Sequence, residues 1–190
     1  AGTSLNGMLE NFYGEKFSNH NVSKMHDNNI VAAASHTTLA SALDLFPNAK
    51  FVAVLRSPEA RFKSTIRHLY ARKGWPAYSD IGPVISELID DNGFFKMNKN
   101  ILESKIFRER FDNLQVRYLS LEKVNQYVET KHLESAKLSL NKLHAILLQE
   151  TFTSDSQKLM KSLGEENIDI MKENKAKSQI PLWDVMPDEL

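Results

Sequence analysis

The sequence contains no cysteine, and this absence restricts the chemistry that it can perform. Without cysteine the chain can form no disulfide, no thiolate nucleophile and no cysteine-ligated metal site. A cytoplasmic setting, bacterial or cytosolic, is the simpler expectation, and the Golgi lumen stays open as the alternative. The sequon Asn21-Val22-Ser23 adds little support for secretion, because three-residue patterns occur by chance.

The chain also lacks an excess of either charge and any long apolar run. It has 24 Lys and Arg residues and 24 Asp and Glu residues, so its formal net charge is 0. This balance argues against nucleic-acid binding through bulk charge, although it leaves room for a local basic pocket. The longest apolar runs, residues 30–34 and 51–55, are far too short to span a membrane.

What the sequence does contain is enough apolar material for a core. Hydrophobic residues make up 42% of the 190 residues, which predicts one domain over residues 1–190. The first residue is Ala1 and no signal peptide follows it, so we expect an N-terminally trimmed or excised piece.

Apolar spacing along the chain predicts alternating helices and strands. Unbroken apolar runs predict strands that are buried on both faces, and a period near 3.6 residues predicts helices. We expect strands at residues 30–34, 51–55 and 115–120, and helices at 5–12, 39–45, 58–74, 84–91, 98–111, 134–150 and 153–170. This order predicts an α/β fold with a mainly parallel sheet, whose ligands bind at the carboxyl ends of the strands. His36 and Arg56 follow two of these strands.

Residues 51–64 carry the strongest indication of function. The strand delivers Arg56 to the sheet edge, and Ser57 and Pro58 then begin a helix whose free backbone N–H groups favour an anion. The guanidinium of Arg56 matches phosphate oxygens, and Ser64 adds a hydroxyl. The chemistry alone gives equal weight to a surface arginine that closes the strand beside a merely solvated serine.

This segment resembles the 3′-phosphate-binding motif of sulfotransferases that use PAPS (3′-phosphoadenosine 5′-phosphosulfate). The matching residues are the run Leu55-Arg56-Ser57-Pro58, then Arg61 and Ser64. The resemblance implies that Arg56 and Ser64 hold the 3′-phosphate and that Arg61 supports the local fold.

The start of the chain resembles a second motif of the same family, the 5′-phosphosulfate loop. Ala1-Gly2-Thr3-Ser4-Leu5 is similar to the second half of that loop, which implies that Gly2, Thr3 and Ser4 bind the donor. The alternative is a simple helix cap. The family's lysine and preceding strand have no counterpart here, so the resemblance implies a three-layer, P-loop-like parallel sheet flanked by helices, with its first strand missing.

Further candidate residues lie outside these two motifs. His36 stands where several carbohydrate sulfotransferases place a catalytic base, and a hydrogen-bonded loop histidine is the equal alternative. Lys175 and Lys177 are candidates for a loop that closes over the 3′-phosphate, although a short basic run is usually just solvated. One of the two tryptophans, Trp75 or Trp183, is a candidate to stack on adenine. The equal alternative is that both pack in the core or at its edge.

The resemblance implies a PAPS-dependent sulfotransferase that transfers a sulfuryl group to a hydroxyl of a carbohydrate or small-molecule acceptor without a metal. Residues 72–104 are expected on the acceptor side, with Arg72, Lys73, Trp75 and Tyr78 as contacts. One alternative is a catalytically degenerate domain that binds a nucleotide or partner. The other is a P-loop nucleotide kinase, against which the absence of the GxxxxGK[ST] pattern counts.

Overall fold

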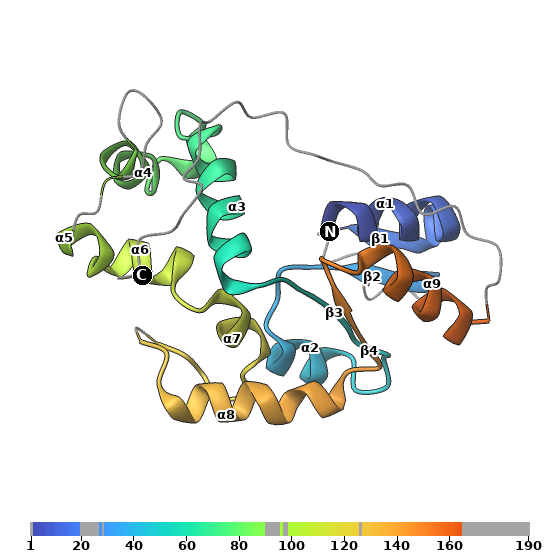
Figure 1. Cartoon of the computed structure of the whole chain (residues 1–190). Coiled ribbons are helices and arrows are strands. Elements are labelled where there is room, and N and C mark those ends of the chain that lie inside the picture. Colours follow the sequence, from blue (N-terminus) through green and yellow to red (C-terminus); the bar gives the residue numbers. More distant parts are fainter. Residues whose placement is uncertain are drawn as a thin grey trace.

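The elements of the chain are taken from a computed structural model, which describes residues 2–19, 27, 29–89, 96, 99–125 and 127–164. Helices predominate, and the strands are short (Figure 1). In chain order the elements are α1 (Gly2–Tyr13), η1 (Gly14–Lys16), β1 (Phe17–Asn19), β2 (Ala32–Ala34), α2 (Leu39–Leu45), β3 (Val52–Leu55), α3 (Pro58–Tyr70), η3 (Pro76–Tyr78), α4 (Gly82–Leu88), α5 (Lys99–Leu102), α6 (Lys105–Phe111), α7 (Leu114–Leu119), α8 (Thr130–Ser139), η4 (Leu140–Lys142), β4 (Ala145–Leu148) and α9 (Phe152–Ser162).

The strands of the described residues form two separate parallel pairs. β1 pairs with β2, and β3 pairs with β4 in a register that runs from Val52 opposite Ala145 to Leu55 opposite Leu148. The second ladder continues at its carboxyl end, where the Gln149 N–H donates to the carbonyl of Leu55 at 2.8 Å. The predicted mixed α/β class with parallel strands is therefore confirmed.

The β3–β4 pair carries one of two hydrophobic cores. Leu147 of β4 is fully buried. It belongs to a cluster with Leu5 and Met8 of α1 and with side chains of α9, namely Phe152, Leu159 and Met160. Figure 1 shows α1 and α9 together beside these strands. This contact fixes the first helix of the chain against the sheet that ends at Arg56.

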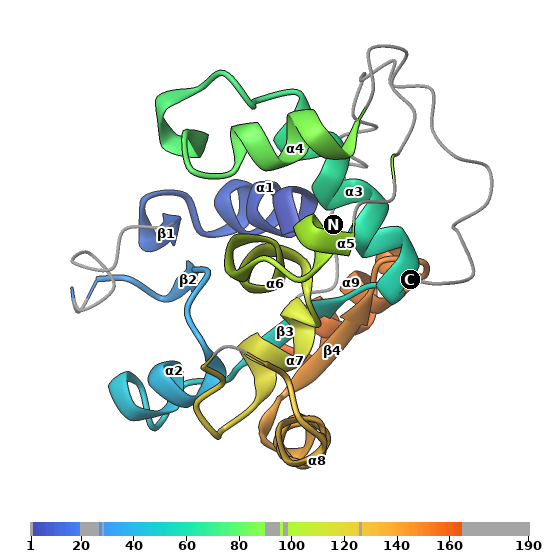
Figure 2. The ribbon, with the colours of Figure 1, turned by 90° about the vertical axis from the view of Figure 1, so that its left-hand side faces the viewer.

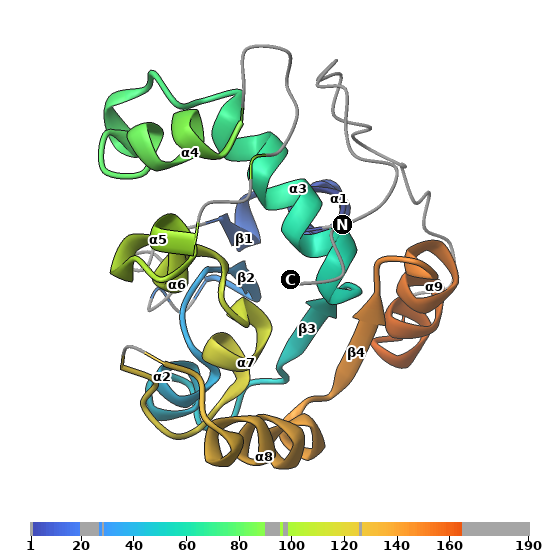
Figure 3. The same cartoon turned by 60° about the vertical axis from the view of Figure 1, so that its left-hand side comes forward.

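The second core is built from helices. It joins α3 to the segment from Ile81 to Phe111 and contains Ile66, Leu69, Ile81, Ile85, Leu88, Ile89, Ile101, Phe107 and Phe111. A Cβ at Gly82 would collide with the carbonyl of Lys73, so only glycine allows α4 to begin so close to the end of α3. Figure 3 shows α4, α5 and α6 on the side of α3 that is opposite to β4.

The prediction of a strand at residues 115–120 is wrong, because this segment forms helix α7. The alternation of Leu114, Val116 and Tyr118 is typical of a strand, but helical spacing places Gln115 and Tyr118 on one face. In the structure these two side chains act on the end of β3 and the start of α3, as described below. Long-range contacts thus outweigh the local pattern.

The prediction of one helix over residues 134–150 is also wrong in its second half. α8 ends at Ser139, and residues 145–148 form β4, the partner of β3. Ala145–Leu148 is an unbroken apolar run, which by period alone fits either a buried helix or a buried strand. Pairing with β3 satisfies its backbone hydrogen bonds, and this decides the outcome.

Two other helix boundaries agree with those predicted from the sequence. α2 spans Leu39–Leu45 as predicted, and α1 ends at Tyr13, directly before Gly14, whose φ of 54° is in the left-handed region that favours glycine. The segment predicted as one helix at 98–111 is split into α5 and α6, because Ser104 accepts from the Phe107 N–H and starts a new helix. Strand β1 was not predicted.

Candidate anion-binding site

Arg56 lies at the carboxyl end of β3, directly before α3, as the sequence predicts. Ser57 is the N-cap of α3, and its hydroxyl accepts from the Ala60 N–H at 3.3 Å. Pro58 occupies the first helical turn, where its missing N–H costs nothing. Figures 1 and 3 show α3 rising from the end of β3 and leading away from the sheet.

The backbone of Arg56 is held by a side chain 59 residues away in the sequence. The Arg56 N–H donates to Gln115 Oε1 at 2.8 Å, and Gln115 Nε2 donates to the Arg56 carbonyl at 2.9 Å. This pair of hydrogen bonds resembles a strand ladder made by an amide side chain. It fixes the point at which the chain turns from β3 into α3, and thereby the origin of the Arg56 side chain.

A carboxylate holds the next residue. The Ser57 N–H donates to Glu150 Oε1 at 3.0 Å, and this hydrogen bond lowers the pKa of Glu150 below its ordinary value, with the charge of Arg56 adding to the effect. The amides of Arg56, Ser57 and Ala60 are therefore already used. Three of the amides around the start of α3 are thus occupied, so an anion here would depend mainly on side-chain donors.

Arg61 is the second guanidinium of the site. It lies in the first turns of α3, is half-buried, and has a buried Nε with no hydrogen-bond partner. Burial lowers the pKa of Arg61; Tyr118 of α7 opposes this effect and the positive charge of Arg56 adds to it. Arg56 and Tyr118 therefore each lie within electrostatic reach of Arg61.

His36 joins the same neighbourhood through Tyr118. Its ring centroid is 6.4 Å from that of Tyr118, with the two rings tilted by 40°. His36 is exposed and lies in the loop after β2, where the Thr37 N–H donates to the Ser35 hydroxyl at 3.0 Å. Tyr118 thus lies near His36 and also within electrostatic reach of Arg61, which in turn lies near Arg56.

Ser64 is half-buried on α3 and follows Arg61 by three residues. Residues three apart on a helix share a face, so Arg61 and Ser64 are neighbours on α3. None of the hydrogen bonds of the described residues uses the Ser64 hydroxyl or the Arg56 guanidinium. Both groups are therefore available to a ligand.

The first turn of α1 lies on the same side of the molecule. Gly2, Thr3 and Ser4 form this turn. Figures 1, 2 and 3 all show its start near the carboxyl end of the β3–β4 pair. The structure thus brings the backbone of both predicted phosphate motifs to one end of the sheet. Lys175, Lys177 and Trp183 lie outside the described residues.

The acceptor-side residues are farther from Arg56. Trp75 is 56% exposed and follows the far end of α3, where the Arg72 guanidinium lies 5.2 Å from the centroid of its ring. Tyr78 accepts from His68, and Lys73 lies 4.2 Å from the ring centroid of Tyr70. These residues form a basic aromatic surface at the C-terminal end of α3. The length of α3 separates this surface from Arg56, which precedes the N-terminus of the helix.

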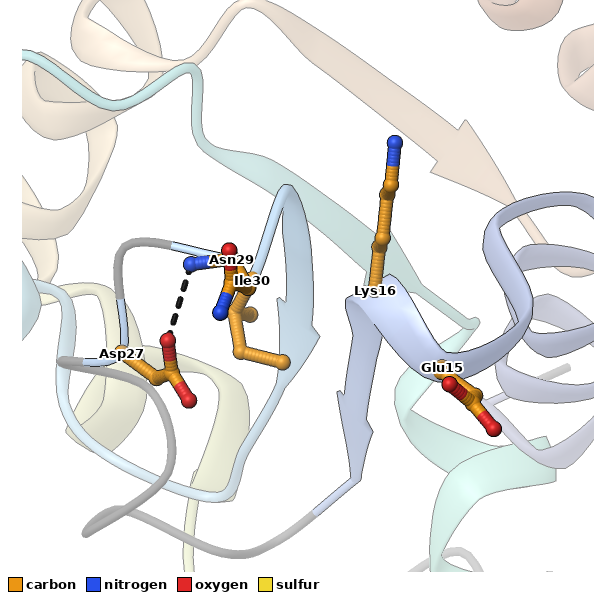
Figure 4. A pocket seen from close by; sticks show the side chains of 5 residues that line it. All are labelled: Glu15, Lys16, Asp27, Asn29 and Ile30. Atoms are coloured by element: carbon orange, nitrogen blue, oxygen red, sulfur yellow. Dashed lines mark hydrogen bonds between the residues drawn. The ribbon is translucent and has the colours of Figure 1, made fainter.

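A hollow of about 440 Å³ lies elsewhere, at the start of the β1–β2 pair. Glu15, Lys16, Asp27, Asn29 and Ile30 line it, and none of them is a predicted site residue. Figure 4 shows the side chains of Glu15 and Lys16 pointing away from Asp27, which accepts from the Asn29 N–H at 2.9 Å. Its charged groups do not converge on one point, so we assign it no role.

The described segments contain neither a metal-binding cluster nor a membrane-spanning helix. Across these residues, no group of three or more His, Asp or Glu side chains could hold a metal ion. The helices seen in the same ranges include none with the length and apolarity needed to cross a membrane. The residues of the site itself carry cationic and hydroxyl groups, which suit an anion rather than a cation.

Sequence reasoning missed Gln115, Tyr118 and Glu150. The first two fall in the segment that was predicted as a strand, and Glu150 follows a strand that was predicted as a helix. The position of Glu150 just after an apolar run that ends at Leu148 could have indicated the carboxyl end of a parallel strand. No comparable indication existed for Gln115.

Comparisons with known proteins give no independent assignment. No protein-family model, curated protein or solved structure matches this chain. The function is therefore argued from the geometry of the site and from the residues that form it.

Proposed function

We propose that this chain is a sulfotransferase-like domain that binds the nucleotide of PAPS and transfers its sulfuryl group to a hydroxyl. One observation carries the proposal. Arg56 stands at the carboxyl end of the half-buried parallel strand β3, near a second half-buried guanidinium, and Ser64, whose hydroxyl makes no hydrogen bond among the described residues, follows on the next helix. Guanidinium and hydroxyl donors at such a strand end suit a phosphate.

The proposed function also implies a specific arrangement of the sheet and its helices. The two parallel pairs, with α1 and α9 packed beside β3 and β4, are compatible with a three-layer P-loop-like sheet flanked by helices. In this arrangement the first turn of α1 would face the 5′-phosphosulfate, and Arg56 and Ser64 would face the ribose 3′-phosphate. The exposed first-turn N–H groups of a helix favour such an anion.

The proposed reaction needs a base and a stabilised leaving group. The acceptor oxygen forms a bond to sulfur while the bond from sulfur to the 5′-phosphate oxygen breaks, and adenosine 3′,5′-bisphosphate leaves. The neutral imidazole of His36 would take the proton of the acceptor hydroxyl. His36 is exposed and lies beside Tyr118, so a hydroxyl of a carbohydrate or small-molecule acceptor can approach it from solvent.

Calorimetric titration with adenosine 3′,5′-bisphosphate tests the proposal. We expect the wild-type chain to bind and Arg56→Ala to bind roughly ten- to hundredfold more weakly, because a charge-assisted hydrogen bond is lost. Arg110→Ala is the matched control, since it removes an exposed arginine that pairs with Asp80 at 2.9 Å. The control is expected to bind as the wild type does.

The outcomes separate the possible functions. No binding by the wild type, or equal binding by Arg56→Ala, would reject the proposed site. Binding without transfer of the sulfuryl group from PAPS to any hydroxyl would leave a nucleotide-binding domain without turnover. Stronger binding of ATP with magnesium than of the bisphosphate would favour a nucleotide kinase instead.

A further inference from the structure

The guanidinium of Arg61 is half-buried and lacks an acid to balance it. Its Nε is buried without a hydrogen-bond partner, and no salt bridge of the described residues includes it. Burying a charge is costly unless it is paired. Arg67 of the same helix shares the unpartnered Nε, so what distinguishes Arg61 is its position close to Arg56 at the end of β3. The sequence resemblance gives Arg61 only a supporting role in the local fold, and that role would be expected to use its donors.

The neighbours of Arg61 increase this imbalance. Arg56 acts on it as a like charge, and the phenol of Tyr118 is its other electrostatic neighbour. Glu150 lies close enough to Arg56 for the positive charge to lower the pKa of the carboxyl, whereas the groups that shift the pKa of Arg61 are Tyr118 and Arg56 and include no carboxylate. One positive charge is thus left uncompensated next to Arg56, on the helix face that also carries Ser64.

Resting on the proposed function, we propose that Arg61 binds the ribose 3′-phosphate together with Arg56 and sets the preference for a nucleotide with that phosphate. A phosphomonoester carries a charge of about −1.5 to −2 at neutral pH, which one arginine partly neutralised by Glu150 does not balance. A second guanidinium supplies the missing charge and further donors. A nucleotide with only a 5′-phosphate gains nothing from Arg61.

Arg67 provides a matched control on the same helix. It is also half-buried, and its Nε is likewise buried without a hydrogen-bond partner. It lies six residues beyond Arg61, which is about 9 Å farther along the helix axis. Arg67→Gln therefore removes the same chemical group in a similar environment, at a distance from the end of β3.

The experiment measures the affinities of adenosine 3′,5′-bisphosphate and adenosine 5′-phosphate for the same variants by competition titration. We expect Arg61→Gln to weaken bisphosphate binding by about ten- to a hundredfold and to leave adenosine 5′-phosphate binding unchanged. Arg67→Gln is expected to change neither affinity. Arg61→Lys keeps the charge and the aliphatic stem without the planar fork, so it should give an intermediate bisphosphate affinity even if Arg61→Gln folds poorly.

Different results would reject the proposed function and the proposed role of Arg61. A wild-type chain that binds neither nucleotide, or binds both equally, would overturn the proposed function and this inference together. A wild-type chain that prefers the bisphosphate, with that preference undiminished in both Arg61→Gln and Arg61→Lys, would overturn the inference alone. An equal loss of bisphosphate affinity in Arg61→Gln and Arg67→Gln would also overturn it, because a general disturbance of α3 would then explain both.

Discussion

Arg56 owes its position to two side chains that are distant in the sequence. Gln115 holds its backbone N–H and carbonyl, and Glu150, 93 residues away, holds the N–H of Ser57. A binding role for Arg56 could be proposed from the sequence, because a cation directly after an apolar strand has a direct chemical use. The two supporting residues could not, because a local pattern carries no information on which distant side chain will reach a given amide.

The residue scale yields a prediction for Gln115→Glu. The carboxylate keeps an acceptor for the Arg56 N–H but loses the donor to the Arg56 carbonyl and brings two acceptors together. We expect the free energy of unfolding in urea to fall by about 1–3 kcal/mol and bisphosphate affinity to fall with it. Gln157→Glu, the same change at an exposed position of α9, is the control and should alter neither quantity.

A variant of Gln115 with unchanged stability and affinity would show that the Arg56 turn does not depend on this side chain. Reduced stability without reduced affinity would limit Gln115 to a structural role. Only the joint decrease supports its role in positioning Arg56.

Helix α3 connects the candidate site to the basic aromatic surface at its far end. Its N-terminus was predicted from Ser57 and Pro58, since capping chemistry is local and has strong residue preferences. Elements whose state depends on a partner were predicted less well. Residues 145–148 became a strand because β3 is available to pair with them, and residues 115–120 became a helix that contacts Arg56.

The end of α3 is joined to η3 by His68. Arg72 Nη1 lies 2.9 Å from His68 Nδ1, and because a guanidinium only donates, this ring nitrogen must accept. His68 Nε2 then carries the hydrogen and donates it to the Tyr78 hydroxyl at 3.1 Å. Partial burial, followed by the charge of Arg72, lowers the pKa of His68 below its usual 6.5.

This junction predicts a pH-dependent contribution to stability. The pKa of His68 is lower in the folded protein than in the unfolded chain, so the unfolded chain takes up the proton at a higher pH. The free energy of unfolding therefore falls as the pH decreases from 6.5 through the folded-state pKa of His68. We expect His68→Gln to reduce the loss of unfolding free energy between about pH 7.5 and about pH 5. Arg72→Gln should reduce it less, since the burial remains. Identical pH profiles of wild type and His68→Gln would contradict this account.

The candidate site lies between the two hydrophobic cores of the molecule. One core joins α1 and α9 to the β3–β4 pair, and the other joins α3 to the helices that follow it. Arg56 stands where β3 of the first core leads into α3 of the second. The predicted α/β class was accessible from the order of elements, whereas the division into two cores depends on tertiary contacts.

The central claim is that Arg56 and Ser64 converge on a ribose-borne phosphate at the carboxyl end of β3. A crystal structure of the full chain with adenosine 3′,5′-bisphosphate tests it most directly. We predict the 3′-phosphate between the Arg56 guanidinium and the Ser64 hydroxyl, with the 5′-phosphate at the first turn of α1. A nucleotide bound in the hollow near Glu15 and Asp27, or a 3′-phosphate that contacts neither Arg56 nor Ser64, would contradict the claim.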